Sequence, residues 1–76
     1  MHRPHVIQMN LEKVVGLNVK RYREKRGLSQ EELADISGLH RTYISGVDRG
    51  VRNPTIRIVQ ILAQALRVKP TDLLTE

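Results

Sequence analysis

The stretch from residue 30 to residue 49 holds two short apolar patterns with a glycine between them. Ser29 precedes the first pattern and is suited to cap a helix, because its hydroxyl accepts a hydrogen bond from the free N–H groups of the first turn. Gly38 tolerates the left-handed backbone that commonly ends a helix. Beyond it, Ile44 and Val47 lie three residues apart and share one side of a second helix. The sequence therefore predicts two short helices that turn sharply at Gly38.

The first of these helices has an apolar side that we expect to be buried, formed by Leu33, Ala34 and Ile36. Ala34 is small at the point where the second helix has to cross closely. In the second helix we expect the residues other than Ile44 and Val47 to lie on the surface. They are His40, Arg41, Thr42, Tyr43, Ser45 and Gly46.

The segment from Asn10 to Gly27 predicts a helix that precedes this pair. An apolar stripe runs along it at intervals of four and three residues, formed by Val15, Val19 and Tyr22. Residues 1 to 9 show no helical period. We expect them to form a flexible arm ahead of a domain that covers residues 10 to 76.

Two more helices are predicted after a loop at Asn53-Pro54, because the residue before a proline is pushed out of helical geometry. Thr55 is suited to cap a helix over about residues 56 to 66, and Pro70 to begin a short helix through Leu74, with Lys69 or its neighbour as the cap. No segment shows the alternating pattern of a strand, so the fold class is all-α with five helices. The expected inward positions of the fourth helix are Ile56, Val59, Leu62, Ala63 and Leu66.

The helix over residues 56 to 66 also carries a second apolar stripe, formed by Ile58, Ile61 and Ala65. A surface helix of a monomer is normally polar on that side, so we expect a second copy of the chain to cover the stripe. Leu74 is assigned to the same dimer interface. The alternative is that the domain covers this helix itself, for example with residues 1 to 9.

Size and composition narrow the class of protein. Seventy-six residues allow one domain, and a formal charge of +5 is enough to attract a polyanion without proving that it does. The absence of cysteine excludes a disulfide framework and thiolate chemistry. With no signal peptide at its start and no apolar run long enough for a bilayer, we expect a cytoplasmic protein that does not enter a membrane.

The sequence lacks the residue patterns of an enzyme. His2, His5 and His40 do not have the spacing of a metal site on a helix, and no glycine-rich phosphate loop follows a strand. A domain of this size also shelters no cleft for catalysis. We therefore expect no catalytic residue, no metal, no cofactor and no small-molecule ligand.

Three segments, in order and at matching spacing, closely resemble the phage-repressor-like (Xre-type) helix-turn-helix regulators, and most of all the controller proteins of restriction-modification systems. The similarity covers about residues 11 to 74. The resemblance implies a compact lambda-repressor-like domain. It also implies that the second of the two helices joined at Gly38 enters the major groove of DNA. The segments are Arg23-Glu-Lys-Arg-Gly-Leu-Ser-Gln-Glu-Glu-Leu-Ala, Arg41-Thr-Tyr-Ile-Ser-Gly-Val-Asp-Arg-Gly-Val-Arg-Asn-Pro-Thr-Ile and Ala63-Gln-Ala-Leu-Arg-Val.

Three residues at the start of this recognition helix are candidates for base contacts. The guanidinium of Arg41 matches the O6 and N7 acceptors of guanine, and the alternative is an exposed arginine that reaches a phosphate. Thr42 offers a methyl group to a thymine as well as a hydroxyl. Tyr43 resembles a base-proximal position of the family, but its ring could instead shield the helix pair from solvent.

Six residues are candidates for contacts to the DNA backbone, which fix register and carry no sequence code. At the position of Gln30 the family places a glutamine that bonds a phosphate and braces the recognition helix; the alternative is a solvated capping amide. The resemblance implies that Arg52 and Asn53 grip the backbone. Arg57 either contacts a phosphate or belongs to a solvated face. The full set is Gln30, Ser45, Arg49, Arg52, Asn53 and Arg57.

The resemblance further implies an ion pair between Arg23 and Asp48, and a dimer that binds two half-sites about 34 Å apart. The predicted function is that of a homodimeric, sequence-specific transcriptional regulator that binds double-stranded DNA at a (pseudo)palindromic operator, as a restriction-modification controller or a phage-like repressor. One alternative is the DNA-binding antitoxin of a toxin–antitoxin pair. The other is a helix-turn-helix module used only for protein interaction.

Overall fold

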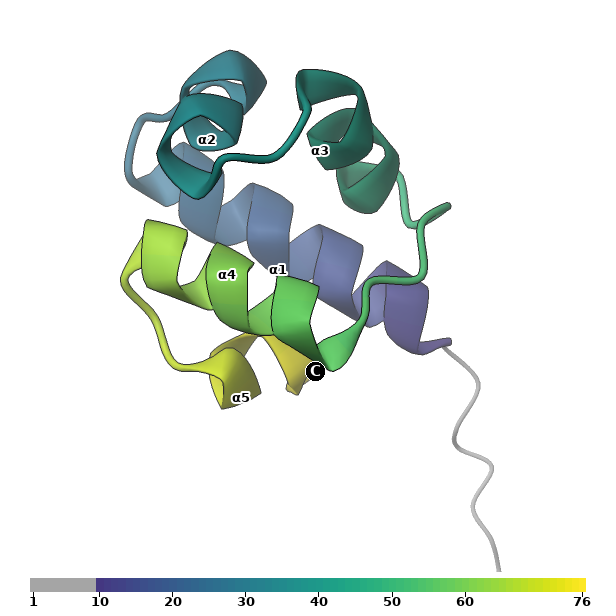
Figure 1. Cartoon of the computed structure of the whole chain (residues 1–76). Helices are drawn as coiled ribbons and strands as arrows, with labels where there is room; N and C mark the ends of the chain where they lie inside the picture. Colours follow the sequence, from purple (N-terminus) through teal and green to yellow (C-terminus); the bar gives the residue numbers. More distant parts are fainter. Residues whose placement is uncertain (1–9) are drawn as a thin grey trace, which may run out of the picture.

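The computed structural model describes residues 10 to 76, and the arm expected at residues 1 to 9 lies outside them. The described part is all-α, as predicted, and contains five helices and no strand. They are α1 (Leu11–Lys25), α2 (Gln30–Ser37), α3 (Arg41–Asp48), α4 (Ile56–Leu66) and α5 (Pro70–Leu74) (Figure 1).

The predicted caps determine where the helices begin. The side chain of Asn10 accepts a hydrogen bond from the backbone N–H of Lys13 at 2.9 Å, and that of Thr55 accepts one from Ile58 at 3.2 Å. Ser29 forms a reciprocal pair with Glu32, in which each side chain bonds the other residue's backbone N–H, at 3.0 and 2.8 Å. Such caps satisfy N–H groups that have no partner within the helix.

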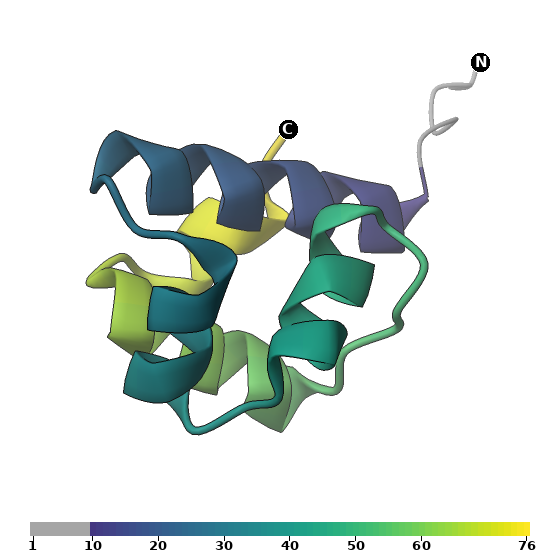
Figure 2. The same cartoon turned by 90° about the horizontal axis from the view of Figure 1, so that it is seen from above.

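Gly38 ends α2 with φ 76°, in the left-handed region that favours glycine. This turn brings α3 across α2, and the two short helices form one side of the molecule (Figures 1 and 2). α1 packs against α3, α4 and α5, while α4 also packs against α2 and α5. The helix-turn-helix is therefore held on a base made of the three other helices.

The core lies where α1 and α4 meet the helix pair. It confirms the inward positions Val15 and Val19 in α1, Leu33 and Ala34 in α2, Ile44 and Val47 in α3, and Val59, Leu62, Ala63 and Leu66 in α4. Tyr22 is partly buried against it. The largest side chains with almost no exposed surface are Leu33, Ile44, Leu62, Leu66 and Leu73.

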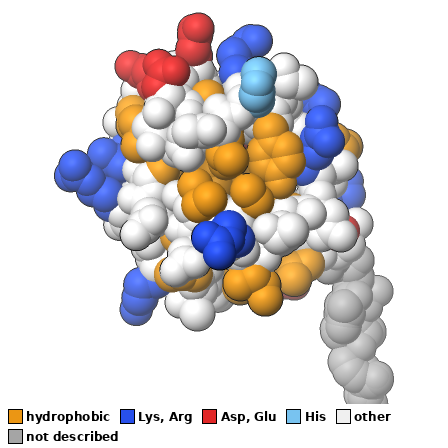
Figure 3. All heavy atoms as spheres, viewed as in Figure 1, with side chains coloured by type: hydrophobic (Ala, Val, Ile, Leu, Met, Phe, Trp, Pro, Cys, Tyr) orange, Lys and Arg blue, Asp and Glu red, His pale blue; other side chains and the backbone are white. Residues whose placement is uncertain are grey.

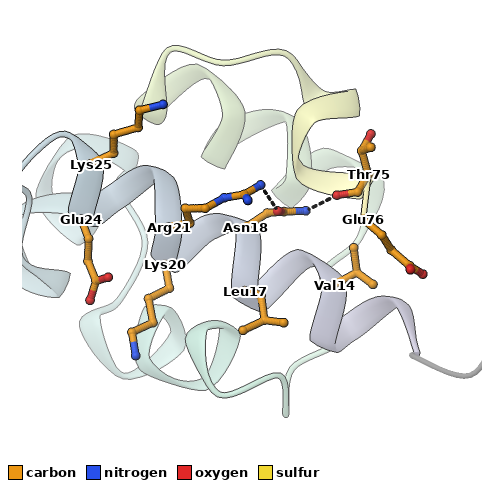
Figure 4. A pocket seen from close by; sticks show the side chains of 9 residues that line it. All are labelled: Val14, Leu17, Asn18, Lys20, Arg21, Glu24, Lys25, Thr75 and Glu76. Carbon is orange, nitrogen blue, oxygen red and sulfur yellow. Dashed lines mark hydrogen bonds between the residues drawn. The ribbon is translucent and has the colours of Figure 1, made fainter.

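A buried asparagine in α1 fixes the end of α5. The Nδ2 group of Asn18 donates to the carbonyl oxygens of Leu73 and Thr75, each at 2.9 Å. Its Oδ1 accepts a hydrogen bond from Arg21, also at 2.9 Å (Figure 4). Because all of these donors and acceptors are paired, the polar side chain can be buried at little cost, and the short α5 is tied to α1.

Two residues expected in the core are exposed. Ile36 is 54% exposed because Leu33 and Ala34 define the buried side of α2, and Ile36 lies roughly a third of a turn away from it. Ile56 is 89% exposed because it occupies the first turn of α4, at the edge of the core, where no described element covers it. Both assignments to the core were wrong.

The second stripe of α4 is less exposed than expected. Ala65 is only 8% exposed, and Ile58 and Ile61 are partly buried. The reason is that α4 is covered by α2 on one side and by α1 and α5 on others, and that Arg26 of the α1–α2 turn donates to the carbonyl oxygen of Ala65 at 2.9 Å. The prediction that Ala65 belongs to an open stripe was therefore wrong.

Candidate nucleic-acid interface

The first turn of α3 is an open surface that carries the predicted base contacts. Arg41 and Thr42 are exposed, and His40 precedes them as an exposed N-cap residue. Tyr43 is partly buried and packs against the core, so its ring shields the helix pair on one side. Because the backbone of α3 is fixed by Ile44 and Val47 in the core, the side chains of this first turn are presented from a rigid support.

Arg52 belongs to the loop after α3, but its side chain packs against α3 instead of projecting away from it. The central carbon of its guanidinium is 5.4 Å from the centroid of the Tyr43 ring, the geometry of a cation–π contact. A Cβ added to Gly46 would lie 2.7 Å from Cγ of Arg52, so this glycine leaves the space in which the arginine rests. The side chains of Tyr43 and Arg52 thus form a single surface.

This packing corrects the prediction for Gly46. We expected it on the surface of α3. Gly46 is instead buried, and the group that approaches it is the side chain of Arg52. A glycine within a helix indicates a close contact, but the sequence alone does not name the partner.

Ser45 and Arg49 are joined on the outer edge of α3. A guanidinium N–H of Arg49 donates to Oγ of Ser45 at 2.6 Å. Both residues were predicted to contact the DNA backbone, and the structure brings them to the same part of the helix. Arg49 is exposed, which leaves its remaining N–H groups available to an anion.

A buried polar network connects α1, α2 and α3. Arg23 donates to Oδ2 of Asp48 at 3.0 Å and to the carbonyl oxygen of Leu28 at 2.8 Å. The amide of Gln30 donates to the same carboxylate oxygen at 3.0 Å. The side chains of Arg23 and Asp48 are only 10% and 5% exposed, so breaking this pair would leave a charge buried without its partner. The predicted ion pair is confirmed.

The network gives Gln30 a structural role that the sequence suggested only in part. Its amide braces the end of α3 through Asp48, as the family resemblance implied. The alternative of a merely solvated capping amide is wrong. Contact with a phosphate stays a prediction, and it would use the second N–H of the same amide or the N–H groups at the start of α2.

Gly16 sets the distance between α1 and the end of α3, and sequence reasoning missed it. A Cβ at this position would collide with the carbonyl oxygen of Val47 and lie 3.2 Å from both the carbonyl oxygen of Asp48 and the backbone nitrogen of Gly50. These are backbone atoms and cannot rotate away. The available signal was a glycine in the middle of a helix, which costs about 1 kcal/mol relative to alanine unless a close contact requires it.

Two residues that were predicted to contact the DNA backbone lie further from the start of α3. Arg57 is exposed in the first turn of α4, and Asn53 lines a groove beside the start of α1. The groove has a volume of about 410 Å³. We call it the apolar groove, and its walls include Leu11, Pro54, Ile56, Val59, Pro70 and Leu74.

The apolar groove holds the largest uncovered hydrophobic side chains of this part of the molecule: Leu11 is 57% exposed, Ile56 is 89% exposed and Leu74 is 41% exposed. Apolar side chains also gather on the face of α4 that Figure 3 shows, between this helix and the helix pair. Leu39, Tyr43 and Ile58 are among the apolar residues that are only partly buried against the core. The side chains of Leu11, Ile56 and Leu74 in the groove are more exposed than these three.

Two kinds of feature are absent from the part of the chain that the structure describes. Between residues 10 and 76, no helix combines the length and the apolar character of a membrane span. The same residues contain no group of three histidine, cysteine or acidic side chains placed to hold a metal ion.

Two helices joined at a left-handed glycine, with an exposed and basic first turn on the second, define a helix-turn-helix protein. Residues 19–73 match the helix-turn-helix family model, and the chain belongs to this family of DNA-binding transcriptional regulators. It is 49% identical over 67 residues to the control protein C.SmaI of Serratia marcescens, covering 88% of this chain and 80% of that protein.

Solved structures of controller proteins share the fold. The restriction-modification controller protein C.AhdI from Aeromonas hydrophila is 42% identical, with a TM-score of 0.78 over 82% of this chain and 94% of that one. The C.Esp1396I controller, solved as a tetramer in complex with its natural 35 base-pair operator, is 36% identical, with a TM-score of 0.78 over 87% of each chain. The chain is thus a member of the family that contains restriction-modification controllers.

Proposed function

We propose that this chain is a transcriptional regulator that binds a (pseudo)palindromic operator as a homodimer and controls restriction-modification genes. The observation that carries the proposal is the exposed first turn of α3, with Arg41 and Thr42, on a helix whose other end is anchored by the Arg23–Asp48–Gln30 network. The similarity to C.SmaI and C.AhdI supports the choice of regulated genes. The proposal assigns no catalytic step to the chain and locates it with its operator in the cytoplasm.

Sequence specificity comes from α3 in this account. Arg41 donates two hydrogen bonds to a guanine, and Thr42 packs its methyl group on a thymine. Tyr43 is held by the core and by Arg52, so it offers one edge of its ring to the bases without having to be ordered on binding. A side chain that is already fixed loses less conformational entropy when the complex forms.

The backbone contacts surround this helix. Arg49 and Ser45 lie on its outer edge, and Arg52, stacked on Tyr43, carries the positive charge of the following loop. Gln30 at the start of α2 and Asn53 in the loop are assigned to neighbouring phosphates. Arg57 would reach a phosphate from the first turn of α4.

The homodimer forms through the apolar groove. Covering Leu11, Ile56 and Leu74 with a second copy stabilises the dimer, since burial of one such side chain contributes about 1.5 to 3 kcal/mol. The groove includes the loop that follows α3, so a two-fold axis there would bring the two loops together and leave one recognition helix on each side. Half-sites one DNA turn apart, about 34 Å, require that arrangement.

Two measurements test the proposal together. Sequences that bind the purified chain are selected from a random pool of duplexes, and the mass of the free chain is measured by sedimentation. An enriched inverted repeat with a guanine in each half, bound by a protein that is a dimer, supports the proposal. A monomer that enriches no sequence contradicts it and favours a helix-turn-helix used for protein interaction.

A further inference from the structure

Lys13 of α1 lies across the turn that ends the recognition helix. A Cβ added to Gly50 would be 3.0 Å from Cγ of Lys13 and 3.2 Å from its Cα. Gly50 has φ 73°, and this left-handed turn lets the aliphatic part of the lysine side chain pack directly on the backbone. The backbone of Lys13 is also held in place, because its N–H donates a hydrogen bond to the side chain of Asn10, the N-cap residue of α1.

The side chain of Lys13 shares a surface hollow with the last turn of α3. The hollow has a volume of about 150 Å³ and is lined by Lys13, Leu17, Asp48, Arg49 and Gly50. Asp48 faces it from α3, but its side chain is 5% exposed and its carboxylate is paired with Arg23. The charges with access to solvent are therefore the two cations, Lys13 and Arg49, both of which are exposed.

We propose that Lys13 and Arg49 together bind one phosphate of the DNA backbone beside the recognition helix. The inference rests on the proposed function and adds to it a contact from α1, a helix to which no DNA contact was assigned. Figure 2 shows the start of α1 beside the end of α3 and the loop that carries Arg52. A lysine ammonium on a flexible stem suits a phosphate, since it acts as a point charge that needs no fixed orientation.

A purely structural role for Lys13 would have a different signature. A cation near the end of a helix also stabilises the helix by interaction with its terminal carbonyl groups. That effect would raise the melting temperature and leave the number of ions released on DNA binding unchanged. A phosphate contact is counted instead by the slope of log K against log salt, which changes by about 0.9 for each phosphate neutralised.

The test uses Lys13→Met, which keeps the aliphatic packing on Gly50 and removes the charge. Lys69→Met is the matched control, because it removes the same charge at the start of α5, which lies on the opposite side of the molecule from α2 and α3 (Figure 1). Binding to a sequence selected from a random pool is measured between about 50 and 200 mM salt. We expect Lys13→Met to lower the slope, by at most about 0.9 per chain and about 1.8 per dimer because Arg49 still faces the same phosphate. Lys13→Arg should retain the slope of the parent protein, and Lys69→Met should leave it unchanged.

Each other result has a definite meaning. A slope for Lys13→Met equal to that of the parent protein, while Arg52→Ala lowers the slope, overturns the inference and leaves the proposed function intact. A lower melting temperature with an unchanged slope assigns Lys13 a structural role only and also overturns it. A parent protein that selects no DNA overturns the proposed function itself.

Discussion

Gly16→Ala tests whether the contact between α1 and the end of α3 determines the stability of this domain. On an isolated helix the change would stabilise by about 1 kcal/mol, because alanine has the higher helix propensity. Here the new methyl group meets the carbonyl oxygens of Val47 and Asp48 and the nitrogen of Gly50. Since backbone atoms must move to make room, the added carbon overpacks the interface.

The size of the effect follows from these opposing contributions. Overpacking of a well-packed core typically costs about 1 to 3 kcal/mol, and a collision with backbone belongs to the upper part of that range. After the gain in propensity is subtracted, we expect a net loss of about 2 kcal/mol in the free energy of unfolding. For a domain of this size the melting temperature would fall by about 8 to 16 °C.

Gly46→Ala is the matched control. The three heavy atoms nearest to its methyl group would all belong to the side chain of Arg52, with Cγ at 2.7 Å, and that flexible side chain can rotate away. We therefore expect the stability of Gly46→Ala to stay within about 1 kcal/mol of the parent, while its affinity for DNA falls because Arg52 loses its place on Tyr43.

Thermal unfolding followed by circular dichroism, at one protein concentration for all three proteins, measures both changes. Fixed concentration matters because association shifts the apparent stability. If Gly16→Ala proves as stable as the parent, α1 and α3 do not meet as closely as described. If Gly46→Ala lowers the melting temperature more than Gly16→Ala does, a contact with backbone atoms is not the more costly of the two, and the explanation is refuted.

Three further predictions concern DNA binding and assembly. Arg41→Ala should cost about 1 to 3 kcal/mol on the selected site and far less on unrelated DNA in a titration, and an equal loss on both would make Arg41 a phosphate contact. Arg52→Ala should weaken binding to both kinds of DNA and lower the salt slope by about one unit per chain, whereas an unchanged slope would remove Arg52 from the interface. Ile56→Asp should shift the protein towards monomer in sedimentation without loss of helix, because an unpaired charge in an apolar interface costs several kcal/mol. Ile36→Asp is its control, because Ile36 is 54% exposed on α2 and does not line the apolar groove, so this variant should stay dimeric. A folded Ile56→Asp variant that stays dimeric would exclude the apolar groove.

The helices were predictable because their ends are encoded locally. A cap such as Ser29 or Thr55 acts within one turn, and Gly38 is required by the φ angle of a single residue. The ion pair between Arg23 and Asp48 was predictable only through the family resemblance. Twenty-five residues separate its partners, and no local pattern joins them.

The packing of individual side chains was less predictable, because periodicity gives the apolar side of a helix but not which neighbours cover it. Ile56 has the spacing of a core residue and is exposed, whereas Ala65 has the spacing of an outer residue and is buried. The position of the Arg52 side chain depends on the path of the loop after α3 and on the space that Gly46 leaves. These are tertiary features, and a pattern of residue types contains no measure of them.

A hydroxyl-radical footprint of the chain on a sequence selected from a random pool tests the central claim most directly. We expect two protected half-sites related by two-fold symmetry, with centres about 34 Å apart, that appear together as the protein is added. A single protected half-site, or uniform weak protection along the duplex, would contradict a dimer that presents one recognition helix on each side of the apolar groove.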